Sequence, residues 1–436
     1  MPDTPKPKHD HASLNFPEGF LWGAATSAFQ VEGNNTNADW WEWEQKNQPA
    51  EKRSGLSANQ YELYEKDFDL AKELGHNSHR LSIEWSRIEP EEGQFNQEAI
   101  DHYIKVLKVL KSLNFTVMLT LWHFTNPQWF AEKGGWTNFK SAFYFERFVK
   151  KIAPELLDYV DFWITINEPG VYTFMSYLGG DSAGAFPPAK KNTTQALLVT
   201  WNLARAHKKA YKVLRSLHPQ KPIGIAQNVQ SFEPFHKHSL IEQFAVGISD
   251  MVTNHSFYFL TKGYHDFLGL NYYFNYRLNR QKGLLPEVAN PEVQERDVSD
   301  LGWEIYPEGI FSVLTDLADG LPIYITECGI ASTNDDRRTR FLINYLQEVY
   351  RAIESGVKVK GFFYWSLIDN FEWHRGFDPR FGLVEVNYET QKRTIRPSAL
   401  VYREIIKRNA IPHDLLKLLG HGIRVEDVLK EGIHHD

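Results

Sequence analysis

The feature that most constrains this chain is a repeated alternation between short apolar runs and longer segments with helical spacing. The runs are rich in β-branched and aromatic residues, as strands are. The longer segments place apolar residues three and four positions apart, as one face of a helix does. The expected strands are 20–27, 77–83, 115–122, 161–168, 222–228, 266–273, 322–327 and 359–366, and the expected helices include 58–75, 98–114, 141–160, 192–217 and 337–356. Pro154 should kink or interrupt the third of these helices.

Eight strands separated by helices fit either a closed parallel barrel or an open doubly wound sheet. The placement of polar residues favours the barrel. Several runs end at a side chain that can take part in catalysis. His123 directly follows 115–122, and Glu168 and Glu327 are the last residues of 161–168 and 322–327. In a TIM barrel all of these carboxyl ends converge on one face, where active sites lie. We therefore predict an α/β fold with a single (β/α)8 barrel and catalytic residues at the C-terminal ends of its strands.

The same reading predicts the domain organisation. Residues 1–15 are rich in Pro, Lys and His and are expected to form a flexible arm. No linker or abrupt change of composition interrupts 16–409, so this stretch is predicted to be one barrel domain. Residues 410–436 are expected to form a short helical extension.

Charge and cysteine content exclude several classes of protein. The net charge of −7, without a basic run, argues against a nucleic-acid partner. The single cysteine, Cys328, excludes an internal disulfide. With a polar N-terminus and no apolar window long enough to span a membrane, we expect a cytoplasmic protein without a membrane partner. No cofactor or metal site is predicted, because the histidines at 236–238 lie in a polar segment. The oligomeric state stays open.

Two glutamates carry the chemical argument. Glu168 in WITINEPG and Glu327 in IYITECGI each end an apolar strand, where an ionised carboxylate is costly unless it is paired or functional. One such residue could be a salt-bridged core residue, but two at strand ends indicate function. Hydrolysis of a glycosidic bond needs an acid for the leaving oxygen and a carboxylate facing the anomeric carbon.

The chain also resembles glycoside hydrolase family 1. The resemblance is carried by FPEGFLWGAATSAFQVEG, RLSIEWSRIEP, TINEP, ITECG and YWSLIDNFEWHRGFDPRFGL, which occur in the family's order from residue 16 to about 409. It implies a retaining β-glycosidase, with β-glucosidase favoured, that cleaves terminal non-reducing β-D-glycosides of small oligosaccharides or of aryl and alkyl glucosides. Net transglycosylation by the same chemistry, or a carbohydrate-binding barrel with weak catalysis, are the alternatives.

The resemblance assigns roles to the catalytic residues. Glu327 matches the family nucleophile and Glu168 the acid/base, and a retaining pair stands roughly 5–5.5 Å apart. Arg80 is expected to keep Glu327 ionised, and the like charge on Glu327 to raise the pKa of Glu168. Tyr273 resembles the phenol that hydrogen-bonds the nucleophile, and Asn271 in the same strand run is grouped with the catalytic residues.

By the same motif match, a second set of residues is implied to bind the non-reducing sugar. Asn167 would contact the 2-hydroxyl, while Glu372 and Gln30 would hold the 4-hydroxyl region. Glu372 would repel a 6-phosphate, so unphosphorylated glucosides, galactosides or fucosides are expected. The full set is Gln30, His123, Asn167, Trp365, Glu372, Trp373 and Phe381.

The sequence departs from the family pattern in four places. Cys328 stands where the family usually has Asn, and is expected to be an inert buried thiol. Trp122 and His79 also replace commoner residues. The segment 230–265 looks shortened, and we predict an open or mobile flank with unusual apolar exposure there.

Overall fold

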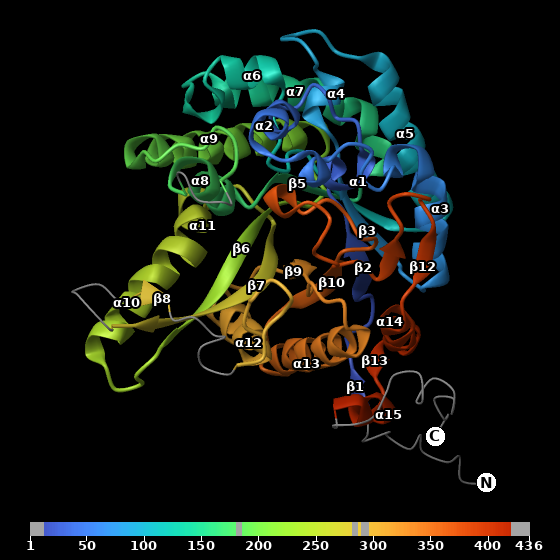
Figure 1. Ribbon diagram of the computed structural model, residues 1–436, viewed down its shortest axis with the longest axis vertical. Helices are drawn as coiled ribbons and strands as arrows, with labels where there is room; N and C mark the ends of the chain where they lie inside the picture. The colour runs from blue at the N-terminus through green and yellow to red at the C-terminus, as the bar shows by residue number, and fades with distance from the viewer. Residues whose placement is uncertain (1–12, 180–184, 281–286, 289–295, 420–436) are drawn as a thin grey trace.

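The computed structural model describes residues 13–179, 185–280, 287–288 and 296–419, and it confirms the predicted barrel (Figure 1). Eight parallel strands lie in the order β6-β5-β4-β3-β2-β10-β9-β7, and an additional pairing of β6 with β7 closes the sheet on itself. The strands are β2 (Leu21–Ala25), β3 (Ser78–Ser82), β4 (Thr116–Thr120), β5 (Phe162–Asn167), β6 (Ile223–Pro234), β7 (Phe267–Asn279), β9 (Ile323–Cys328) and β10 (Val359–Trp365). Each corresponds to one of the eight predicted runs.

Apolar side chains fill the structure in two layers. A small cluster that includes Ala25, Met118, Ile164, Ala226 and Phe363, contributed by five of the strands, is buried together. A much larger cluster joins the opposite faces of the strands to the surrounding helices. The strands are therefore apolar on both faces, as expected of a parallel sheet covered by helices.

The five predicted helices are present with small shifts at their ends. They are α3 (Gln60–Glu73), α5 (Gln97–Ser112), α7 (Ser141–Leu156), α9 (Thr193–Leu217) and α13 (Asp335–Glu354). The side chains of Asn96, Asn192 and Asn334 accept backbone N–H bonds at the starts of α5, α9 and α13, which fixes where those helices begin. Helix α7 continues through Pro154 and ends two residues later, followed by a 3-10 turn over Leu157–Tyr159.

Shorter elements connect the barrel. The helices are α1 (Ala28–Glu32), α2 (Asp39–Asn47), α4 (Trp85–Ile88), α6 (Gln128–Glu132), α8 (Pro169–Tyr177), α12 (Pro307–Asp316) and α14 (Pro397–Arg408). The minor strands are β8 (Glu287–Val288), which pairs with β7, and β11 (Val384–Val386) with β12 (Arg393–Ile395). Among the described residues, no helix is both long and apolar enough to pass through a lipid bilayer.

The ends of the described chain meet. Residues 14 and 15, which the sequence prediction placed in a flexible arm, form the short strand β1 (Leu14–Asn15), paired with β13 (Ala410–Ile411). The predicted C-terminal extension, 410–436, begins with β13 and continues with α15 (His413–Leu416) and a 3-10 turn over Lys417–Leu419. Residues 1–12 of the arm and 420–436 of the extension lie outside the described residues.

The segment 230–265 differs from its surroundings. Strands β6 and β7 remain paired beyond the barrel, from Gln230 with Phe274 to Pro234 with Leu278. The chain then forms α10 (Leu240–Asp250), a single π-helical stretch over Met251–His255 and α11 (Ser256–Leu260). Leu240, Phe244 and Phe259 are among its exposed large side chains, so the predicted apolar exposure is found.

Candidate active site

The two predicted glutamates are buried at the C-terminal ends of two strands, β5 and β9, that are not adjacent in the barrel. Glu327 belongs to β9, next to β7 and β10 in the barrel. Glu168 follows β5 directly and precedes α8, with its backbone in the left-handed region at φ 44°. Non-glycine residues in this conformation are uncommon and concentrate at functional sites. The turn from strand to helix therefore aims the Glu168 side chain into the barrel mouth.

Glu327 has two direct partners. Arg80 Nη1 donates to Glu327 Oε1 at 2.5 Å, and both side chains are almost fully buried. The Tyr273 hydroxyl donates to Glu327 Oε2 at 2.8 Å. Each carboxylate oxygen thus accepts a hydrogen bond from a different strand, which fixes the orientation of the carboxylate plane.

Glu168 is held by amides. Asn271 Nδ2 donates to Glu168 Oε1 at 2.7 Å, and Asn228 Nδ2 lies 3.3 Å from the same oxygen. Asn271 Nδ2 also donates to Asn167 Oδ1 at 3.1 Å, so one amide links Glu168 to the residue before it. No cation contacts Glu168 within hydrogen-bonding distance among the described residues.

These surroundings shift the pKa values of the two carboxyl groups to different extents. Burial, followed by the charge of Glu327, raises the pKa of Glu168 to about 8. Burial also raises the pKa of Glu327, but the Arg80 charge and the Tyr273 hydrogen bond oppose that rise. Since only Glu327 has a buried guanidinium beside it, the surroundings favour the charged form of Glu327 more than that of Glu168.

The predicted sugar-binding residues join the same group. Asn167 Oδ1 accepts from Arg80 Nη2 at 2.6 Å, and its Nδ2 lies 3.2 Å from His123 Nε2. The His123 ring stacks near both Trp365 and Trp373, with ring planes 16° from parallel in each case. The remaining two links complete the group: Gln30 Nε2 donates to Glu372 Oε2 at 3.3 Å, and the Phe381 ring packs edge-on to Tyr273.

Glu372 is a third buried carboxyl in this group. Burial, followed by the charges of Glu327 and Glu168, raises its pKa to about 8. His123 has a pKa well below its usual value, because burial and the nearby Arg80 charge both disfavour its protonation. The site therefore combines one buried charge pair with carboxyl, amide and imidazole groups that can hydrogen-bond sugar hydroxyls.

The structure shows contacts that the sequence prediction missed. Asn228 ends the predicted run 222–228 exactly as the other polar residues end theirs, so strand-end position was a signal that could have found it. Asn370 Oδ1 accepts from Gln30 Nε2 at 3.1 Å, but the sequence offers no pattern that indicates this contact.

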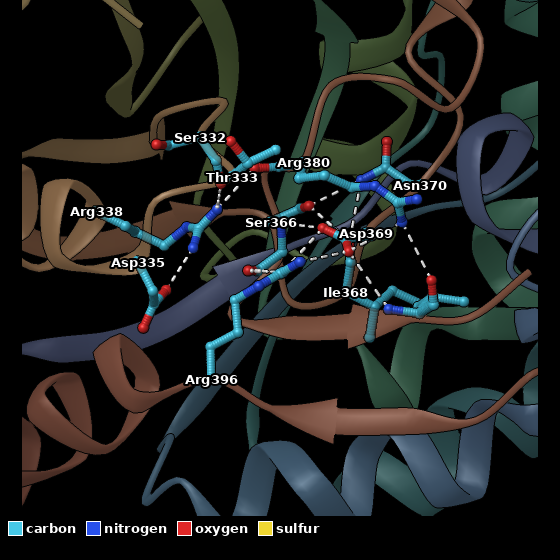
Figure 2. Close-up of polar contacts among 12 residues, drawn as sticks. Ser332, Thr333, Asp335, Arg338, Ser366, Ile368, Asp369, Asn370, Arg380 and Arg396 are labelled. Carbon is cyan, nitrogen blue, oxygen red and sulfur yellow. Dashed lines mark hydrogen bonds and ion pairs between the residues drawn. The ribbon is translucent and has the colours of Figure 1, made fainter. Parts of the chain in front are cut away.

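A buried ion-pair cluster supports the loop that carries Glu372. Asp369 accepts from Arg396 at 2.8 and 3.0 Å and from Arg380 at 3.4 Å, and these side chains converge on it in Figure 2. The next residue, Asn370, donates to Ser366 Oγ at 2.7 Å. The cluster fixes the chain three residues before Glu372.

Two features outside this group contain potential ligands. His255 Nε2 lies 2.5 Å from Asp316 Oδ2 and 3.3 Å from Asp250 Oδ2, an approach between α12 and the π-helical stretch that sequence spacing could not reveal. A cavity of about 450 Å³ has Asp39 and Asn126 in its lining and none of the twelve predicted site residues. The ion pairs of His255 explain why these three side chains lie together. The cavity is separate from the glutamate pair.

Together, the closed barrel and the paired carboxyl groups at its C-terminal face define a glycosidase-type TIM-barrel enzyme. Comparison with known proteins makes this assignment specific. The model of glycosyl hydrolase family 1 matches residues 12–257 and 238–411. The chain belongs to this family, and it is a retaining β-glycosidase.

Similar proteins span almost the whole chain. A 1,4-beta-D-glucan glucohydrolase of Thermotoga neapolitana is 33% identical over 91% of this chain and 99% of its own length. A beta-galactosidase of Pyrococcus woesei is 31% identical over 93% of this chain and 100% of its own. The solved structure of a beta-glycosidase from Pyrococcus horikoshii has a TM-score of 0.85 and 38% identity, and covers 94% of this chain and 98% of that one.

Proposed function

We propose that this glycosidase hydrolyses terminal, non-reducing, unphosphorylated β-D-glycosides, with β-glucosides preferred, and that Glu327 is its nucleophile and Glu168 its acid/base. The observation that carries the proposal is the asymmetry of the buried pair. Of the two carboxyl groups, Arg80 and Tyr273 contact only that of Glu327, whereas two neutral amides contact that of Glu168.

The asymmetry supports a double displacement. The ionised Glu327 attacks the anomeric carbon, while Glu168 transfers its proton to the leaving oxygen, so that a covalent glycosyl-enzyme and a free alcohol form. Glu168, now ionised, takes a proton from a water molecule, which attacks the anomeric carbon and releases Glu327. Asn271, which donates to both Glu168 and Asn167, holds the Glu168 carboxyl group in place through both steps.

The choice of sugar is supported by the group around Glu372. This carboxyl is buried and already lies in the field of two other glutamates. A phosphate on the sugar would add further negative charge to a site whose guanidinium, Arg80, is already paired with Glu327. Gln30 and Asn167 present amide groups that can donate to and accept from hydroxyl groups. An unphosphorylated sugar is the better partner for this group.

The roles of the two glutamates can be tested with an aryl β-glucoside. Glu327→Ala should abolish turnover, and azide should restore it with formation of the inverted, α-linked glycosyl azide. Glu168→Ala should slow hydrolysis strongly, and azide should then give the β-linked product. Gln30→Ala, which leaves both glutamates intact, should raise KM, and azide should give no glycosyl azide with this variant. Turnover by Glu327→Ala without azide would contradict the mechanism.

A panel of nitrophenyl glycosides would test the sugar preference. We expect the highest kcat/KM with the β-glucoside, measurable turnover of the β-galactoside and β-fucoside, and none of the 6-phospho-β-glucoside. The comparisons include both a glucan glucohydrolase and a beta-galactosidase. A preference for the phosphorylated sugar would overturn the role proposed for Glu372.

We also propose that the barrel spanning 16–409 is the functional domain and that the enzyme is cytoplasmic. The continuous buried core that includes residues from Phe16 to Ile406 supports a single barrel domain, and Ile411, Leu415 and Leu418 of the extension pack into the same core. The single cysteine, which is free and buried, supports a reducing compartment.

A further inference from the structure

Helix α10 has its polar and apolar faces reversed relative to an ordinary surface helix. The only residue of α10 that is fully buried is Glu242. Its carboxylate accepts from the backbone N–H groups of His236 and Arg280 and contacts the His236 ring. The large apolar residues of the helix, Leu240, Ile241, Phe244 and Ile248, are in contrast exposed. A surface helix normally buries its apolar stripe against the core.

The outward apolar residues continue across the π-helical stretch into α11. We call Leu240, Phe244, Ile248, Met251, Val252 and Phe259 the apolar stripe, because their spacing follows successive helical turns. Leu240, Phe244 and Phe259 are 79%, 70% and 74% exposed. Single exposed apolar residues are ordinary, but a run of them on one surface marks an interaction site.

Neighbouring helices extend this surface. Helix α11 contacts α9, and α9 contacts α8, and the four helices α8, α9, α10 and α11 lie along one side of the molecule (Figure 1). Phe174 in α8 and Leu197 and Trp201 in α9 are also exposed. The exposed apolar residues therefore extend over several elements on this side.

The segment that carries the apolar stripe has a net charge opposite to that of the whole chain. Residues 190–264, from α9 through α11, contain ten lysine and arginine residues but only three aspartate and glutamate residues, in a chain of net charge −7. Lys209 and Arg215 pair with acids from outside the segment. The acids within the segment are themselves engaged: Glu233 with Arg277, Glu242 with His236, and Asp250 with His255. Lys237 and Lys262 are exposed just before and after the apolar stripe.

We propose that the apolar stripe and the basic residues around it bind the surface of an anionic lipid bilayer. Apolar side chains beside lysines are the composition of helices that lie in the interface of a membrane, with the apolar face in the acyl region and the lysines at the headgroups. Binding of this kind needs no membrane-spanning helix. A second copy of the chain fits less well, because a two-fold contact would bring the two basic surfaces against each other.

Vesicle flotation with the full-length enzyme tests the proposal. The probe is a set of vesicles of phosphatidylcholine with and without phosphatidylglycerol, at low and high salt. We expect the wild type to float with the anionic vesicles, with less binding to pure phosphatidylcholine and at high salt. Phe244→Ser/Ile248→Ser/Phe259→Ser should lower the partition coefficient by about a hundredfold or more, because three apolar side chains no longer insert.

Matched variants separate the two contributions. Phe139→Ser removes a phenylalanine that is 71% exposed but lies outside the stripe, and should bind vesicles as the wild type does. Lys237→Glu/Lys262→Glu should weaken binding to anionic vesicles and remove most of its salt dependence. Turnover of an aryl β-glucoside and the Tm should be unchanged in every variant, which shows that each is folded and keeps the proposed chemistry distinct from lipid binding.

The opposite results are equally definite. The proposal is overturned if the wild type does not float with anionic vesicles, or if the triple serine variant floats as well as the wild type. Sedimentation that shows a dimer in the wild type and a monomer in the triple variant, without vesicle binding, would assign the surface to a second copy instead.

Discussion

At Glu168 the backbone and the side chain make opposing demands. The chemistry requires a carboxyl group, while the left-handed backbone, at φ 44°, disfavours any residue with a Cβ. Comparing two replacements isolates the backbone contribution, because both remove the carboxyl. Glu168→Gly should be more stable than Glu168→Ala by about 1 kcal/mol. Thermal or urea unfolding of the two variants measures this difference, and equal stability would mean that the turn relaxes when the side chain is lost.

The pKa of Glu168 makes a prediction about pH. Glu168 must be protonated to act as an acid, and its pKa is raised to about 8, so kcat/KM should fall as the pH rises through about 8. The Asn228 amide hydrogen-bonds the Glu168 carboxylate and lowers this pKa. Asn228→Ala should therefore shift the basic limb of the kcat/KM profile to higher pH.

The control for this shift is His79→Gln. His79 is buried with Thr26 as its hydrogen-bonding partner and does not contact Glu168, so its replacement should leave the basic limb in place. A basic limb that does not move in Asn228→Ala, or that moves to lower pH, would contradict the role of this amide.

Cys328 is next to the nucleophile in sequence but should be chemically silent. The side chain is fully buried and its pKa lies well above the usual value because of burial. Only the thiolate reacts with thiol reagents. The native enzyme should thus resist a maleimide or a disulfide reagent, and the thiol should become reactive only on denaturation. Rapid labelling with loss of activity in the native state would show that β9 opens more readily than its burial indicates.

Prediction from sequence worked unevenly at the scale of single residues. Asn167, Glu168 and Glu327 could be placed together because each lies at the end of a strand, and the barrel brings strand ends to one face. Arg80 and Asn271 lie inside β3 and β7. Gln30 and Glu372 could be found only through motif resemblance, since neither ends a strand. The contact of Asn370 with Gln30 depends on the turn after β10, and no residue pattern predicts that turn.

Among the elements, the loop after β10 depends on the Asp369 cluster. Arg396→Ala removes the closer of the two guanidinium groups that contact Asp369 and leaves a buried carboxylate incompletely paired. We expect a loss of about 3 kcal/mol in the free energy of unfolding, with a higher KM because Glu372 follows on the same loop. Urea unfolding and steady-state kinetics measure the two effects.

A surface ion pair provides the comparison. Arg351→Ala removes the partner of Glu348 on α13, where the arginine side chain is 53% exposed. Exposed pairs of this kind contribute roughly 0–1 kcal/mol, so stability and KM should hardly change. Equal losses of unfolding free energy in the two variants would mean that the buried Asp369 cluster stabilises the protein no more than a surface ion pair does.

The flank between β6 and β7 should exchange hydrogen unevenly. The outer part of β6, up to Pro234, is paired with β7 and should be well protected. Helix α10 buries only Glu242 fully, so its amides should exchange faster than those of α9, which buries many apolar residues. Hydrogen exchange followed by mass spectrometry tests this, and equal protection of α9 and α10 would contradict it.

The elements themselves were predictable where their periodicity was strong. The eight strands appeared as apolar runs because a parallel sheet covered by helices buries both faces. The extension of β6 and β7 past the barrel was not visible, since the sequence from Ser231 to Pro234 mixes polar and apolar residues. The π-helical stretch was also hidden, because its composition resembles that of an ordinary helix.

For the whole molecule, the barrel and the convergence of its site could be predicted, but the orientation of α10 could not. Periodicity reveals that a helix has an apolar stripe, yet it does not say which side faces the core. The sequence alone indicated unusual apolar exposure near 230–265 only through comparison with a family pattern. The reversed orientation became visible when Glu242, rather than Phe244, was found inside.

The uneven charge of the α9–α11 side has a consequence beyond contact. A molecule with excess positive charge on one side and excess negative charge elsewhere has an electric dipole, and a charged surface exerts a torque on it before the two touch. The enzyme would thus approach an anionic surface already turned, despite its own net negative charge. In salt at physiological strength this torque acts only over about 8 Å, so the last few water layers decide which side arrives first.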